Sequence, residues 1–136
     1  MIVLVSAAVY ISFRATSPQP KAKAAGIPPY FQRIDDARPF PATLTPEWSK
    51  QSQVRKAHQI ARAMPEVLAQ QPCYCYCKRK RHRSLLDCFA SDHASNCDIC
   101  VREAIFAGQE RENDKSPEEI RAEIMDGAWK SIQVTN

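Results

Sequence analysis

The six cysteines of this chain fall in one short window, and this feature limits what the chain can fold into more than any other. The window, residues 73–100, also contains two of the three histidines. Its candidate metal ligands are Cys73, Cys75, Cys77, Cys88, Cys97, Cys100, His82 and His93. So many thiols close together are typical of either a disulfide framework or a metal site built from thiolates. In both cases the fold must bring this window to one place.

The composition favours a helical fold. The chain has 136 residues, enough for one small domain and its tails. Only 3 glycines accompany 10 prolines, which argues against an all-β fold with many tight turns. We predict a mostly α fold: a small cysteine-rich helical domain of about four helices that follows a proline-rich extended segment.

Three regions follow from the composition along the chain. Residues 1–13 contain no charged side chain and form a candidate membrane anchor or signal segment, although a helix of this length reaches only about 20 Å. The alternative is an apolar segment that packs against a partner or the domain. Residues 14–46 hold seven of the ten prolines and predict an extended tether or a strap laid over a surface. Residues 47–136 are the predicted cysteine-rich helical domain.

Several residues predict helix boundaries inside that domain. Thr45 followed by Pro46 has the pattern of a helix start. Pro65 is expected to end or kink the first helix. Ser95 and Ser116 each precede an acidic residue by three positions, which predicts a capping box at the start of each of two later helices.

The disulfide and metal interpretations make different use of the triplet Cys73, Cys75 and Cys77. Neighbouring cysteines separated by one residue rarely bridge, so each would pair most easily with one of the three later cysteines. For metal binding, an extended Cys-x-Cys-x-Cys segment would point the three thiols to one face. The sequence alone leaves both interpretations open.

If a metal binds, the donor types favour Cu(I). A zinc ribbon normally shows two Cys-x-x-Cys pairs, and here only Cys97 and Cys100 have that form, so zinc is the second choice. Sulfur-rich ligation without that pattern suits Cu(I), with His82 or His93 assisting. If the cysteines form disulfides, we expect no cofactor.

The charge of the chain is unevenly distributed. Residues 51–83 carry a net charge of +7, and residues 84–136 carry −6. The basic run consists of Lys78, Arg79, Lys80, Arg81 and Arg83. It is either a solvated face or a docking patch for anionic lipid headgroups or an acidic protein. Nucleic-acid binding is not favoured, because no aromatic platform or DNA-reading pattern accompanies the charge.

The sequence offers little for catalysis. It has no nucleophile elbow, no His-Glu-x-x-His pattern and no phosphate loop. Cys97 and Cys100 form a Cys-x-x-Cys at a predicted helix start, but the flanking strand and helix of thioredoxin are absent. We therefore expect a protein that is not an enzyme.

The cysteine window also resembles a known family. The residues that carry the resemblance are Pro72-Cys73-Tyr74-Cys75-Tyr76-Cys77, His82, Ser84-Leu85-Leu86-Asp87-Cys88-Phe89, His93 and Cys97-Asp98-Ile99-Cys100. They are similar to the bacterial proteins named for their PCYCGC motif, over roughly residues 55–130. That resemblance implies export, a secreted or membrane-tethered (lipo)protein and a shared cysteine and histidine core. Tyr76 stands where the motif's name has glycine, so we expect a change in backbone geometry near the third cysteine.

Two functions from different classes remain as expectations. The first is an extracytoplasmic protein, on the periplasmic or cell-surface side, that is tethered to the membrane by its N-terminus and binds a soft metal such as Cu(I). The second is a disulfide-stapled accessory subunit of a larger membrane protein complex, such as an electron-transfer complex. They differ in whether the thiols are free.

Overall fold

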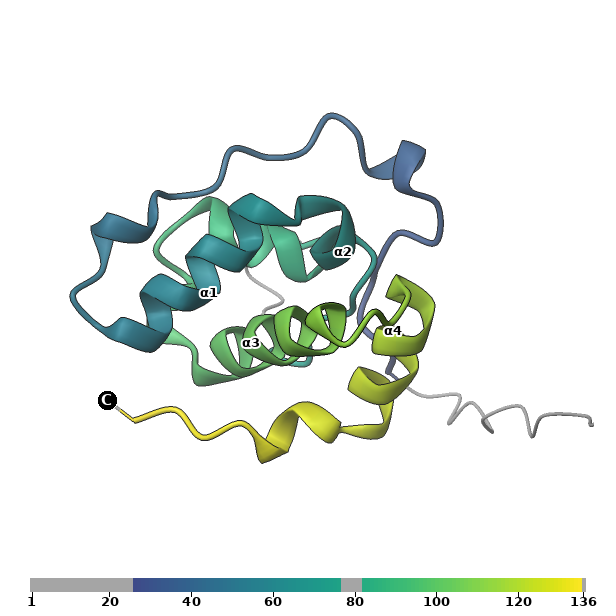
Figure 1. The fold of residues 1–136 in the computed structure, drawn as a ribbon. Coiled ribbons are helices and arrows are strands. Elements are labelled where there is room, and N and C mark those ends of the chain that lie inside the picture. Colours follow the sequence, from purple (N-terminus) through teal and green to yellow (C-terminus); the bar gives the residue numbers. More distant parts are fainter. Residues whose placement is uncertain (1–25, 77–81, 136) are drawn as a thin grey trace, which may run out of the picture.

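The computed structural model describes residues 26–76 and 82–135, and this part of the chain is mostly helical (Figure 1). Its four α-helices are α1 (Ser52–Ala63), α2 (Pro65–Ala69), α3 (Asp98–Glu112) and α4 (Pro117–Asp126). Short 3-10 helices lie at Ile34–Ala37, Pro46–Trp48, Leu85–Ala90, Ala94–Asn96 and Ala128–Ser131. The predicted fold class, with about four helices, is confirmed for the described residues.

Helix α3 is the centre of the domain. Eight of its fifteen residues are buried, in an almost continuous run from Cys100 to Gly108. A helix that is apolar on nearly every side is stable only when other elements surround it. Here α1, α2 and α4 pack on α3, together with three of the 3-10 helices. The first turn of α3 therefore lies at a fixed position inside the fold.

Helices α1 and α3 pack tightly because small residues line their contact. The buried face of α1 includes Ala57, Ile60 and Ala61. Gly108 of α3 faces this helix, and a Cβ added at Gly108 would lie 2.7 Å from Cδ1 of Ile60. That distance is shorter than a van der Waals contact, so only glycine fits here without a shift of the neighbouring side chain.

We predict that Gly108→Ala destabilises the protein by about 1–2 kcal/mol, because overpacking outweighs the roughly 1 kcal/mol that alanine contributes to helix propensity. Urea unfolding of the reduced protein measures this change. In an Ile60→Val background, which removes the crowded Cδ1 atom, the same substitution should cost much less. Equal costs in both backgrounds would contradict the packing explanation.

Two of the sequence-predicted boundaries are confirmed. Helix α1 ends at Ala63, and α2 begins at Pro65 with the proline in its first turn. At the start of α4 the Ser116 hydroxyl accepts a hydrogen bond from the Glu119 amide, and the Glu119 carboxylate accepts one from the Ser116 amide. This is the reciprocal capping box that the sequence predicts.

Two other predicted starts are wrong. Thr45 and Pro46 open only a 3-10 turn that ends at Trp48, and α1 begins at Ser52. Trp48 is 53% exposed, so no buried face continues the helix through this stretch. Ser95 does not cap α3, because it lies in a 3-10 helix with its hydroxyl 3.3 Å from Nε2 of His58.

The proline-rich segment crosses the outside of the helices as an extended chain (Figure 1). Its amides at Phe31 and Leu44 donate hydrogen bonds to the carbonyls of Ala69 and Phe89, at 3.1 and 2.9 Å. The guanidinium of Arg121 also lies 4.8 Å from the centroid of the Tyr30 ring. The described part of this segment is thus held on the surface of the domain.

The C-terminal segment returns along α3 to the start of α1. Nε2 of Gln53 donates to the Gln133 carbonyl, and the Thr135 amide donates to Oε1 of Gln53. Across residues 26–76 and 82–135, no helix has the length and apolar character needed to cross a membrane. The candidate anchor, residues 1–13, lies outside the described residues.

Candidate metal centre

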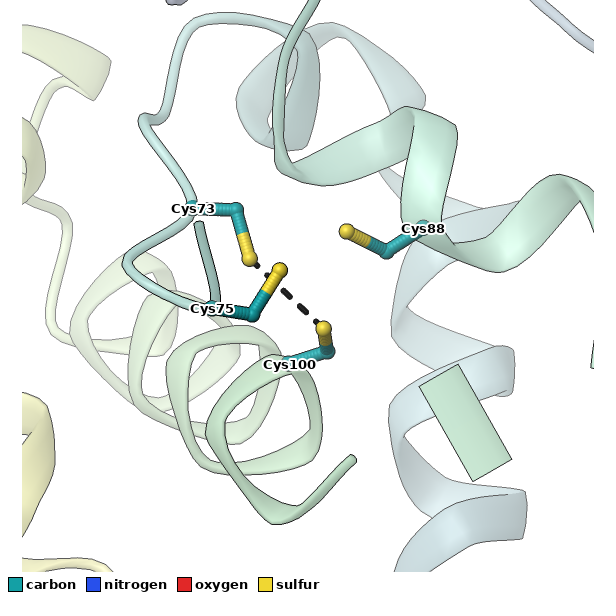
Figure 2. A group of neighbouring side chains, drawn as sticks. All are labelled: Cys73, Cys75, Cys88 and Cys100. Carbon is teal, nitrogen blue, oxygen red and sulfur yellow. Dashed lines mark hydrogen bonds between the residues drawn. The ribbon is translucent and has the colours of Figure 1, made fainter. Parts of the chain in front are cut away.

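Three segments that are separate in the sequence meet at one group of thiols and imidazoles. The turn after α2 supplies Cys73 and Cys75, the segment 82–93 supplies His82, Cys88 and His93, and the start of α3 supplies Cys97 and Cys100. Figure 2 shows the sulfur atoms of four of these cysteines pointing toward a common centre. The structure thus brings together seven of the eight predicted ligands. The eighth, Cys77, lies outside the described residues.

The donor atoms form three overlapping sets of four. The sets are Cys73, Cys75, Cys88 and Cys100; Cys75, His82, Cys88 and His93; and Cys75, His93, Cys97 and Cys100. Within each set all donor atoms lie within 4.8 Å of one another. Two sulfurs on one tetrahedral ion are about 3.8 Å apart when each metal–sulfur bond is about 2.3 Å. The sets therefore need only small movements to surround an ion.

Both predicted histidines face thiols. Nδ1 of His82 lies 3.2 Å from Sγ of Cys88. Nε2 of His93 lies 3.7 Å from Sγ of Cys75 and 3.7 Å from Sγ of Cys100. The two rings also contact each other edge to face, with centroids 5.0 Å apart. Imidazole nitrogens are therefore available as ligands on the side of the cluster that the histidines cover.

The five cysteines of the described segments are free thiols. The closest approach is between Cys73 and Cys100, whose sulfur atoms are 3.6 Å apart (Figure 2). This separation fits a thiol hydrogen bond and is far longer than the roughly 2.0 Å of a disulfide. The described structure thus has the arrangement that the metal interpretation requires.

A turn brings the two thiols of the Cys-x-Cys segment together. Tyr74 and Cys75 lie in a turn, so the extended conformation predicted for this segment is wrong. Cys73 and Cys75 nevertheless point to the same cluster, because the turn brings the second thiol back toward the first. The side chains of Tyr74 and Tyr76 lie against each other, with ring centroids 5.8 Å apart.

Hydrogen bonds between the thiols favour ionisation of two of them. Bonds from Cys100 and Cys73 hold the pKa of Cys75 well below its usual range. Bonds with the same two thiols lower the pKa of Cys88 to about 7. Conversely, the bond with Cys88 raises the pKa of His82. Because thiolates are the metal ligands, the cluster contains groups ready to bind an ion near neutral pH.

The start of α3 carries two further thiols. Cys97 is the N-cap residue of α3, and Cys100 lies in its first turn. Hydrogen bonds with Cys73 and Cys75 raise the pKa of Cys100, which opposes the stabilisation of thiolates by the amides at a helix N-terminus. Cys73, Cys88 and Cys100 are buried, whereas Cys75, Cys97 and both histidines are half-buried. One side of the cluster is therefore accessible to an incoming ion.

Glu103 is a positioning residue that the sequence analysis missed. Its side chain is fully buried one turn beyond Cys100, and its Oε1 accepts a hydrogen bond of 2.8 Å from the Tyr74 amide. Burial raises the pKa of this carboxyl to about 8, against the opposing effect of hydrogen bonds from Cys73 and Tyr74. The signal in the sequence is an acidic residue three positions after a cysteine, within an otherwise apolar helical run.

Only one residue of the predicted basic run falls in the described structure. Arg83 forms an ion pair of 3.2 Å with Asp87, and its guanidinium lies 5.2 Å from the centroid of the Phe31 ring. Lys78, Arg79, Lys80 and Arg81 lie outside the described residues. Arg83 thus links the proline-rich segment to the segment that carries Cys88.

The comparison with protein families gives a match that covers this site. A family model described as "Protein of unknown function with PCYCGC motif" matches residues 40–132, which include all seven clustered donors. The chain belongs to the PCYCGC-motif family. The match also includes the end of the proline-rich segment. No curated protein and no solved structure matches the chain.

Tyr76 stands at the position of the motif's glycine, and its backbone conformation is unusual for a residue with a side chain. Tyr76 has a φ of 48°, in the left-handed region. Glycine adopts this region without the steric cost that a Cβ introduces. At this position, where the motif has glycine, the backbone conformation thus suits glycine better than tyrosine.

We predict that Tyr76→Gly is more stable than Tyr76→Ala by about 1 kcal/mol, although glycine loses more entropy on folding. Both variants remove the ring contact with Tyr74, so their difference reports the backbone alone. Urea unfolding of the two reduced proteins measures it. If the alanine variant is equally or more stable, the left-handed conformation does not constrain this position.

Proposed function

We propose that this chain is a soft-metal-binding protein whose preferred ion is Cu(I). One observation carries the proposal: five free thiols and two imidazoles from three separate segments converge within bonding reach of shared ions. Thiolate-rich sites select Cu(I) and Zn(II) over harder ions. Sulfur outnumbers nitrogen in the donor group, and the donors overlap instead of forming one isolated tetrahedron. Both features support Cu(I) as the first choice and zinc as the second.

The same cluster supports binding and exchange of an ion. Cys73, Cys88 and Cys100 form a buried floor, while half-buried Cys75 and the histidines form the accessible side. Partial exposure of low-pKa thiolates allows a donor molecule to transfer its ion by ligand exchange. The arrangement therefore suits a protein that receives or delivers metal.

We predict that the reduced full-length chain binds Cu(I) under anaerobic conditions and that Cys88→Ser lowers the affinity by about 100-fold or more. The loss should exceed the roughly 10–100-fold typical of changes to residues that only support ligands. Competition with bicinchoninate measures the affinity. His58→Gln is the matched control, because His58 is a buried histidine outside the three donor sets.

The outcomes separate the candidate functions. Retention of full affinity by Cys88→Ser would contradict this site. Tighter binding of Zn(II) than Cu(I), measured against cellular competitors, would make zinc the resident ion. Absence of any bound metal, together with absence of free thiols in protein isolated without reductant, would favour the disulfide-stapled accessory subunit.

We further propose that the domain acts outside the cytoplasm, tethered through its N-terminal region. The apolar composition of residues 1–13 and the prolines of residues 14–46 support this placement. In intact cells a thiol reagent that does not cross membranes should label the native protein, and carbonate-washed membranes should retain it. Deletion of residues 1–13 should release it from the membrane. Protection of the thiols in intact cells would contradict the placement.

A further inference from the structure

The donor group is larger than one ion needs. The three sets contain seven different residues in total. A structural metal ion with tetrahedral geometry takes four ligands. If only one ion were bound, three thiol or imidazole groups would remain beside it, partly buried and without a metal. These groups already contact one another in the metal-free cluster, so a single ion would leave part of an assembled donor group unused.

We propose that the cluster holds at least two soft metal ions bridged by the thiolate of Cys75. This inference rests on the proposed function and adds the number and connection of the ions. Cys75 is the one residue present in all three donor sets. A thiolate sulfur has several lone pairs and can bind two ions at once. A neutral imidazole has a single acceptor nitrogen, so each histidine serves one ion.

The donors divide into two halves around Cys75. One half contains His82 and Cys88, which share a set with Cys75 and also with His93. The other half contains His93, Cys97 and Cys100, which form a complete set with Cys75. Each half thus has one imidazole and at least one thiol of its own. This is the composition expected for two neighbouring ions of the same kind.

The distances fit this division. Sγ of Cys75 and Sγ of Cys100 each lie 3.7 Å from Nε2 of His93. One tetrahedral ion with bonds of about 2.3 Å to sulfur and about 2.0 Å to nitrogen holds such donors roughly 3.5 Å apart. In the half that contains His82 and Cys88, Nδ1 of His82 lies 3.2 Å from Sγ of Cys88.

Cys73 lies between the halves. It shares a set with Cys88 from one half and with Cys100 from the other, and its sulfur is 3.6 Å from that of Cys100. Cys73 is also buried, and its sulfur points toward those of Cys75 and Cys100 (Figure 2). Cys73 is therefore placed to serve as a ligand to an ion in either half.

Charge compensation points the same way. One monovalent ion bound by several thiolates would carry a net negative charge in a partly buried site. Uncompensated buried charge is strongly unfavourable. Each further Cu(I) neutralises one thiolate, so binding of the first ion leaves a site that attracts the second. The ions should therefore fill the cluster together.

The test uses the reduced full-length chain and Cu(I) supplied as its acetonitrile complex without oxygen. Native mass spectrometry should show two or more ions per chain, with little of the single-ion form at intermediate ratios. X-ray absorption should show copper–copper scattering. His58→Gln should keep both signals, since it changes a histidine outside the cluster.

Three variants examine the two halves and the bridge. Cys97→Ser removes a ligand from one half only and should lower the bound copper by at least one ion per chain. Cys75→Ser should abolish the copper–copper scattering even where one ion still binds. Circular dichroism of the metal-free variants establishes that they are folded, and His82→Asn offers a milder change in the first half.

The outcomes separate this inference from the proposed function. Saturation of the wild-type chain at one ion, bound tightly and without copper–copper scattering, would overturn the cluster while leaving metal binding intact. Failure to bind any copper would overturn both. Persistent copper–copper scattering in folded Cys75→Ser would show that Cys75 is not the bridge.

Discussion

The burial of α3 is the constraint on which the rest of this structure depends. A single helix with apolar residues on nearly all sides forces α1, α2 and α4 to pack around it. Its N-terminus, with Cys97 and Cys100, is thereby held still at one end of the core. Gly108 at the other end allows Ile60 of α1 to approach closely. The donor group is built on this fixed first turn.

The remaining donors reach α3 through loops that the core immobilises. Gln71, just before the first cysteine, is buried and donates hydrogen bonds to the carbonyls of Val67 and Pro117. Oε1 of Glu103 then accepts a hydrogen bond from the Tyr74 amide, which orients the turn. Leu85, Leu86 and Phe89 bury the short helix that carries Cys88. These contacts hold the described donors in a fixed frame, which is the general requirement for selective metal binding.

Much of the cluster could be predicted before the fold was known, and some of it could not. The spacing of cysteines and histidines indicated the donors, because their chemistry is evident from residue type alone. The Ser116 capping box and the break at Pro65 were also predictable, since both depend on neighbours within a few positions. The helix starts at Thr45 and Ser95 were predicted wrongly. At Thr45 the capping pattern does not reveal whether a buried helix face follows. At Ser95 it does not reveal that the hydroxyl contacts His58, which is distant in the sequence.

The sequence by itself determined that this chain is helical, rich in thiols and interrupted by proline, because these properties depend on residue type and short spacing. Only the tertiary structure decided that the described thiols stay apart as free groups, that both histidines join them and that Cys75 belongs to every donor set. It also assigned Glu103 to the support of the turn. Several of these features depend on contacts between residues 18 or more positions apart, such as Cys75 with His93 and Cys73 with Cys100. Contacts of that kind are fixed by packing around α3, which no local pattern encodes.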